Sequence, residues 1–129
     1  MSTTGPAHAD RTVVEFPASE GYRNVGRLVV GGIASRFDLP VDRVDDLLLA
    51  IESVFLQESA AETVLLVADL TPDDLRVSLG PLGLSQLQDP ALQRVLSRLV
   101  DHVETQGEGD TGRIELVVTA AYRRTLPGS

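Results

Sequence analysis

The chain has 129 residues, 43% of them hydrophobic, and a formal net charge of −8, which suits one folded domain with its own core. This acidic balance disfavours binding to nucleic acid or to anionic membranes and favours a basic protein partner. The chain contains no cysteine, which excludes disulfides, a thiolate nucleophile and zinc held by cysteine. It also lacks an apolar run of about 18 residues, and residues 1–10 lack the apolar segment of a secretory signal. We therefore expect a cytoplasmic protein.

The first third of the chain predicts a tail, a strand and a helix. Residues 1–10 are expected to form a flexible tail, and the β-branched run 12–16 predicts a strand that ends at Pro17. Residues 18–37 predict a helix with an apolar stripe formed by Tyr22, Val25, Val29, Ile33 and Phe37. Three glycines weaken this helix by up to about 1 kcal/mol each, and they either allow a neighbour to approach closely or are merely tolerated: Gly26, Gly31 and Gly32.

A second helix is predicted from Pro40, which fits a first helical position. Asp42, Asp45 and Asp46 follow it. We interpret them as partners of the positive helix end rather than as a metal site. The core stripe is predicted to contain Val44, Leu47, Leu48, Ile51, Val54 and Phe55. Two leucines lie off this stripe, in a second buried face or an interface: Leu49 and Leu56.

The remaining pattern predicts strands at 63–70, 75–79 and 114–120, a turn at 71–74, a helix at 90–103 and a loop at 106–112. The resulting order, β-α-α-β-β-α-β, indicates an α+β two-layer sandwich with helices on one face of the sheet. We expect a single domain over residues 11–124 and a flexible C-terminus at 125–129.

Two helical motifs indicate a family. The second helix reads Val44-Asp45-Asp46-Leu47-x-Leu49-Ala50-Ile51-Glu52, and the first reads Arg27-Leu28-Val29-Val30-Gly31-Gly32-Ile33. With the element order, they resemble the anti-sigma factor Ser/Thr kinases of the GHKL superfamily (histidine-kinase-like ATPases with the Bergerat fold), particularly the divergent actinobacterial type. The resemblance covers most of residues 11–120. It implies a homodimer that binds a sigma factor or an anti-sigma antagonist. The alternative is an unrelated α+β domain with an amphipathic helix.

The nucleotide-binding positions of that family are altered here. The resemblance places Ser53 where the family has its catalytic Glu and Gln57 where it has the Mg²⁺-binding Asn. Serine cannot act unaided as a general base, and the glutamine amide lies one methylene too far out for tight Mg²⁺ geometry. In the D-x-G-x-G box, Ser78 replaces the Asp, whereas Gly80 is retained. We therefore expect no catalytic residue, no bound metal and no nucleotide; the alternative is residual binding of ATP and Mg²⁺.

A second glycine pattern, Gly107 to Gly112, spells G-x-G-x-x-G. A dinucleotide loop would follow a strand and open a helix, whereas this segment is predicted to follow a helix and precede a strand. Its Glu108 and Asp110 would also repel phosphate. We interpret it as a helix-to-strand turn. His8 lies in the predicted tail, and His102 stands beside Asp101 on the predicted helix without the further ligands of a metal site.

The first helix carries Arg23 and Arg27 one turn apart, and the resemblance implies that Arg27 contacts the sigma factor or antagonist. A solvated helix face is the alternative.

Two main functions follow from these observations. One is a regulatory binding protein that sequesters a sigma factor or binds an anti-sigma antagonist without hydrolysing ATP. The other is an ATP-dependent Ser/Thr kinase that phosphorylates the antagonist. The combined changes at Ser53, Gln57 and Ser78 favour the first, and a purely structural dimerisation module is a third, weaker reading.

Overall fold

The computed structural model describes residues 10–18, 23–37, 39–55 and 62–119. The elements in chain order are β1 (Asp10–Pro17), α1 (Arg23–Arg36), α2 (Val41–Phe55), β2 (Thr63–Leu70), β3 (Asp74–Gly83), α3 (Leu84–Leu87), α4 (Pro90–Leu99), β4 (His102–Glu108) and β5 (Thr111–Thr119). The elements predicted for β1, α1, α2, β2, β3 and β5 are all present, and α3 and β4 are additional to the prediction.

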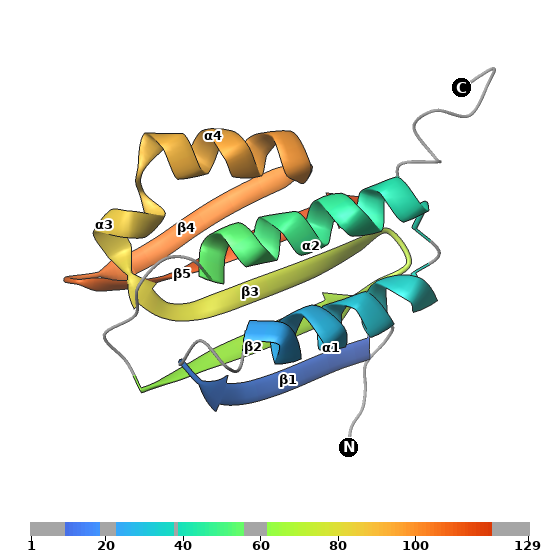
Figure 1. Ribbon diagram of the computed structural model, residues 1–129, viewed down its shortest axis with the longest axis horizontal. Coiled ribbons are helices and arrows are strands. Elements are labelled where there is room, and N and C mark those ends of the chain that lie inside the picture. Colours follow the sequence, from blue (N-terminus) through green and yellow to red (C-terminus); the bar gives the residue numbers. More distant parts are fainter. Residues whose placement is uncertain (1–9, 19–22, 38, 56–61, 120–129) are drawn as a thin grey trace.

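The strands form one five-stranded sheet in the order β1-β2-β3-β5-β4. All four neighbouring pairs are antiparallel. Figure 1 shows α1, α2 and α4 on one face of this sheet. Alternate strand residues such as Leu66, Val77 and Leu116 are fully buried in the core together with the inner sides of these helices. The predicted α+β class with helices on one face is therefore confirmed for the described residues.

The buried side of α1 differs from the predicted stripe. It is formed by Gly26, Val30, Ile33, Ala34 and, just after the helix, Phe37. The predicted stripe members Val25 and Val29 are only half-buried, and Tyr22 lies outside the described residues. A side chain on Gly26 would put its Cβ 2.9 Å from the ring of Phe55. This glycine therefore lets α1 approach α2 closely.

The second helix follows its prediction more closely. The Pro40 carbonyl accepts hydrogen bonds from the amides of Arg43 and Val44, at 2.9 and 3.1 Å, so the first turn forms at the proline. Its buried residues are Leu47, Ala50, Ile51, Val54 and Phe55. The ring of Phe55 meets Phe16 of β1 edge to face at 5.6 Å. Leu49 is 50% exposed, which rules out a second buried face at this position; Leu56 lies outside the described residues.

The predicted helix 90–103 is too long. It begins as expected at Pro90, where the Asp89 side chain accepts a hydrogen bond from the Leu92 amide at 3.1 Å. It ends at Leu99 because Val100 adopts an extended backbone (φ −129°, ψ 168°), and the next amide, of Asp101, donates to the Val117 carbonyl at 3.0 Å. Val103 and His102 therefore belong to strand β4, not to a helix. Val95, which was expected inside, is 45% exposed.

The glycine pattern at 107–112 is a β-hairpin rather than a helix-to-strand turn. Glu108 pairs with Thr111, and Gly109 between them has φ +63°, the left-handed region that a tight hairpin turn needs. Side chains on Gly107 and Gly112 would place Cβ atoms 2.9 and 2.7 Å from Leu84 Cδ1. These two glycines thus form a flat surface on which the start of α3 packs.

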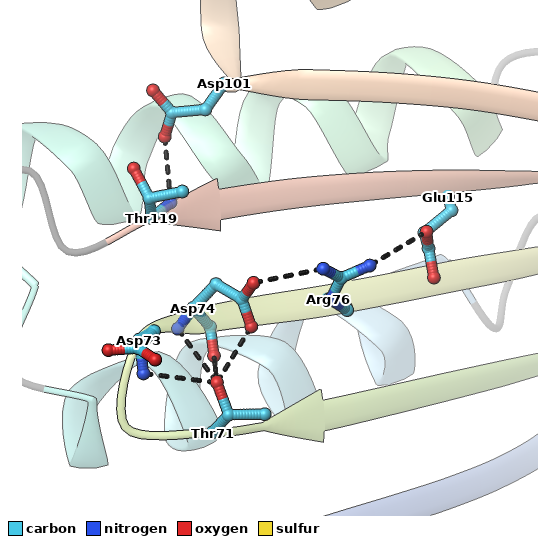
Figure 2. A network of polar contacts seen from close by, with 7 residues as sticks. All are labelled: Thr71, Asp73, Asp74, Arg76, Asp101, Glu115 and Thr119. Atoms are coloured by element: carbon cyan, nitrogen blue, oxygen red, sulfur yellow. Dashed lines mark hydrogen bonds and ion pairs between the residues drawn. The ribbon is translucent and has the colours of Figure 1, made fainter.

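Polar contacts fix the ends of the central strands (Figure 2). The Thr71 hydroxyl accepts hydrogen bonds from the amides of Asp73 and Asp74, at 3.1 and 3.0 Å, and so forms the predicted turn. Arg76 bridges Asp74 and Glu115, at 3.3 and 3.6 Å, and this links β3 to β5. None of the helices in the described part of the chain is long and apolar enough to cross a membrane.

Candidate partner-binding site

A surface groove lies between α1 and α2. Its volume is about 420 Å³, and it is lined by Asn24, Arg27, Leu28, Gly31, Gly32 and Leu48. Five of these residues come from the outer side of α1. Leu28 is 76% exposed, the highest exposure among the large exposed hydrophobic side chains in the described residues. The groove therefore places an exposed apolar side chain beside two residues that have no side chain.

Gly31 and Gly32 keep this groove open. A Cβ built on either residue would meet no atom within 4 Å. The three glycines of the first helix thus divide by role: Gly26 allows internal packing, whereas the other two face open space. Because neither a contact nor the backbone conformation in the described part of the chain requires glycine at these two positions, their presence in a helix is consistent with the close approach of another molecule.

Arg27 forms the polar part of the groove. Its Nε atom is buried and has no hydrogen-bond partner among the described residues. A buried donor without a partner is unfavourable, by about 1–3 kcal/mol. Arg23, the second predicted contact residue, is the first residue of α1, and its side chain is outside the described part of the structure.

The side of α2 next to the groove is acidic. Asp45 and Glu52 are exposed and lie three residues before and four residues after Leu48, which places them on the same side of the helix. Nearer the start of this helix, Asp42 lies in the first turn and Asp46 contacts Arg43 at 3.8 Å. No group of three or more metal-ligating side chains occurs among the residues that the structure describes.

The two described positions that the resemblance assigns to nucleotide binding, Ser53 and Ser78, lie on different elements. Ser53 lies on α2, where its hydroxyl donates to the Leu49 carbonyl at 2.9 Å. Ser78 lies on β3 between Val77 and Leu79, which are both buried under the helices. Because strand side chains alternate between faces, Ser78 points to the face of the sheet away from the helices. Gln57 lies outside the described residues.

On that far face, Ser78 is part of a contact centred on Arg113. Arg113 Nη2 donates to Ser78 Oγ at 3.0 Å and to the Leu65 carbonyl at 3.3 Å, and burial lowers the pKa of Arg113 from its ordinary value. A Cβ on Gly80 would lie 2.7 Å from Arg113 Cγ, so packing explains the retained glycine. The adjoining hollow of about 160 Å³ also contains Glu104 and Glu115, whose negative charges would repel phosphate.

Comparison with known proteins does not assign the chain to a family. No protein-family model matches the chain, and no similar sequence is found among the curated proteins.

The sequence predicted Arg27 and the two open glycines as interface residues, but not Leu28, Asn24 or Leu48, which line the same groove. Leu28 lies outside the predicted apolar stripe of its helix. An apolar residue on the polar side of a helix was the sequence signal that could have indicated an exposed contact surface. Leu48 was assigned to the core, and it is half-buried because one side of it lines the groove.

Proposed function

We propose that this chain is a regulatory protein-binding domain of the Bergerat fold, resembling an anti-sigma factor. In this proposal it sequesters a sigma factor or binds an anti-sigma antagonist, and it does so without hydrolysing ATP. The groove between α1 and α2 carries the proposal, because it combines exposed Leu28, open Gly31 and Gly32, and the unpartnered Nε of Arg27. The motif resemblance of the two helices that line the groove supports the choice of partner class.

The lining of the groove defines the chemistry of the partner segment. An apolar side chain would occupy the space above Gly31 and Gly32 and contact Leu28 and Leu48. An acceptor oxygen, from a carboxylate or a main-chain carbonyl, would accept a hydrogen bond from the guanidinium group of Arg27, which lines the groove. Basic residues on the α2 side would face Asp45 and Glu52, in keeping with the net charge of −8.

The separation of Ser53 from Ser78 by the sheet favours the binding role over the kinase alternative. In a working kinase site, the residue that activates the nucleophile and the residue that binds the base must reach one nucleotide. Here Ser53 lies on helix α2, whereas Ser78 lies on the face of the sheet away from the helices. On that far face, Arg113 packs against Gly80 and donates a hydrogen bond to Ser78 Oγ. Ser78 therefore has a structural partner, Arg113.

Substitution of Arg27 tests this proposal. Arg27→Ala is expected to weaken binding of the partner at least about tenfold, or ~1.4 kcal/mol. The melting temperature should not fall, because Arg27 Nε has no hydrogen-bond partner among the described residues to lose. The partner would first be identified by affinity capture from a bacterial lysate, and its dissociation constant then measured by calorimetry with both proteins purified. Arg94→Ala, which removes an exposed arginine from α4, is the matched control. Equal affinities for wild type and Arg27→Ala would place the interface elsewhere.

A further inference from the structure

The face of the sheet away from the helices has a hollow over its last two strands. Its volume is about 160 Å³, and side chains of β3, β4 and β5 line it: Ser78, Glu104, Gln106, Arg113 and Glu115. A larger groove of about 430 Å³ adjoins this hollow, because Gln106 and Arg113 line both. The groove extends along the β4–β5 hairpin. The two form a continuous depression, separate from the groove between α1 and α2.

Arg113 supplies the positive charge of this depression. Its Nη2 atom donates to Ser78 Oγ and to the Leu65 carbonyl, and both acceptors are neutral. Its guanidinium group forms no ion pair with a carboxylate of the described residues. Burial lowers the pKa of Arg113, because the charged group has lost part of its hydration. A half-buried guanidinium group without a counter-charge favours a carboxylate, which it can bind through two parallel hydrogen bonds.

Glu104 and Glu115 supply negative charge on the other side of the hollow. They lie directly opposite each other on β4 and β5, a position in which like charges repel. Glu115 contacts Arg76 at 3.6 Å (Figure 2). Glu104 is exposed and has neither an ion pair nor a hydrogen bond within the described ranges of the chain. A cation placed between these two carboxylates would reduce their repulsion.

Glu108 adds a third carboxylate, at the hairpin end of the groove. Glu104, Gln106 and Glu108 alternate along β4, so their side chains share one face of the sheet. Gln106 pairs with Arg113, which places the row of the guanidinium group midway between the two glutamates of β4. Each interval of two residues is ~6.6 Å, comparable with the reach of an extended lysine or arginine side chain. The depression therefore presents charges in the order negative, positive, negative.

We propose that this depression binds a free basic α-amino acid, arginine or lysine. The α-carboxylate pairs with Arg113, and the α-ammonium group lies between Glu104 and Glu115. The side chain follows the groove past Pro81 to Glu108. Phosphate or a simple carboxylate would be repelled by the glutamates, and a diamine would leave Arg113 without a counter-charge. The proposal goes beyond the proposed function and does not depend on it, because it concerns the face of the sheet away from the helices.

Titration with arginine and two analogues tests which charges the depression recognises. The probes are arginine, agmatine, which lacks the carboxylate, and Nα-acetylarginine, which lacks the α-ammonium charge. Amide spectra of the isotope-labelled full chain should show saturable shifts around Gln106 and Arg113 with arginine. Both analogues are expected to bind at least about tenfold more weakly. Non-specific attraction to the net charge of −8 would instead favour agmatine, the more cationic molecule. Agmatine binding as tightly as arginine, or no saturable shift with arginine and lysine, would overturn the proposal.

Two matched substitutions locate the α-ammonium group. Glu104→Gln removes an exposed carboxylate that lines the hollow. Glu15→Gln removes an exposed carboxylate of β1 on the same face of the sheet, since Phe16 beside it points into the core. Glu104→Gln is expected to weaken arginine binding about fivefold, the upper range for an exposed charge pair, and Glu15→Gln to leave it unchanged. Equal affinities of wild type and Glu104→Gln, or an equal loss in both variants, would contradict the site.

A third substitution locates the side chain of the ligand. Citrulline has the α groups of arginine and nearly the same shape, but its side chain is neutral. Glu108→Gln, in which circular dichroism verifies the fold, should weaken the binding of arginine and leave that of citrulline unchanged. An equal change for both ligands would contradict the proposed contact between the basic side chain and Glu108.

Discussion

Arg43 of α2 donates a hydrogen bond from Nη2 to Asp101 Oδ2 at 2.6 Å. The same carboxylate oxygen accepts from the Thr119 amide at 2.9 Å, as Figure 2 shows. Both charged side chains are about one-fifth exposed. Asp101 thus joins the helical layer to the end of β5, at the point where the chain leaves α4 and enters β4.

The Arg43–Asp101 contact predicts a measurable loss of stability. Arg43→Ala is expected to lower the free energy of unfolding by about 1.5–3 kcal/mol, the range for hydrogen bonds that involve a charged group. Urea denaturation followed by circular dichroism measures it. A double-mutant cycle with Asp101→Asn isolates the pair from the other contacts of Arg43, such as the one with Asp46. Strictly additive effects of the two substitutions would show that the pair contributes nothing.

The glycines of α1 predict changes of opposite sign. Gly26→Ala should destabilise the fold by about 1–3 kcal/mol, because its Cβ would overlap the buried ring of Phe55 at 2.9 Å. Gly32→Ala should instead stabilise it by up to about 1 kcal/mol, since its Cβ meets open space and alanine favours the helix. Thermal unfolding of the two variants beside wild type measures both effects. The packing described for α1 and α2 would be wrong if Gly26→Ala were as stable as Gly32→Ala.

The separation of Ser53 from Ser78 predicts no productive binding of Mg-ATP. Calorimetric titration of the chain with ATP and Mg²⁺ should show no saturable heat. The variant that combines Ser53→Glu with Gln57→Asn should show no gain, because Ser78 would still face away from the helical layer. A micromolar dissociation constant for the wild type, or a gain in the double variant, would favour the kinase alternative.

Particular residues show how far the sequence determined the fold and where it did not. Repeating apolar residues identified α2, because Leu47, Ile51 and Val54 all face one sheet. The same apolar spacing made the predicted helix too long at its C-terminal end. Leu99 and Val103 keep a helical spacing, although the backbone becomes extended at Val100. Strand β4 is polar and nearly all exposed, so its pairing with β5, a tertiary contact, determines it rather than any local pattern.

The candidate site shows a similar division. The resemblance implied a contact role for Arg27, and the glycines of the same helix suggested close approach of a neighbour; the helical repeat places these residues near one another. Leu48 joins them only through the packing of α2 against α1, which no local pattern encodes. The resemblance implies that Ser53 and Ser78 lie at one nucleotide site. Which face of β3 carries Ser78 depends on which side of the sheet the helices cover, and the sequence motif does not encode that.

The central claim, that the α1–α2 groove binds a regulatory protein partner, is tested most directly by filling the groove. Gly31→Leu adds a side chain whose Cβ would meet nothing within 4 Å in the described residues beyond its own helical turn, and leucine favours a helix more than glycine does, so the fold should be retained. Ser97→Leu adds the same side chain to the exposed face of α4 and serves as the control. Quantitative mass spectrometry would compare the proteins that the wild type and the two variants capture from one bacterial lysate. We predict that a sigma factor or an anti-sigma antagonist is enriched on wild type and on Ser97→Leu and is lost on Gly31→Leu. Equal enrichment on all three would contradict the claim.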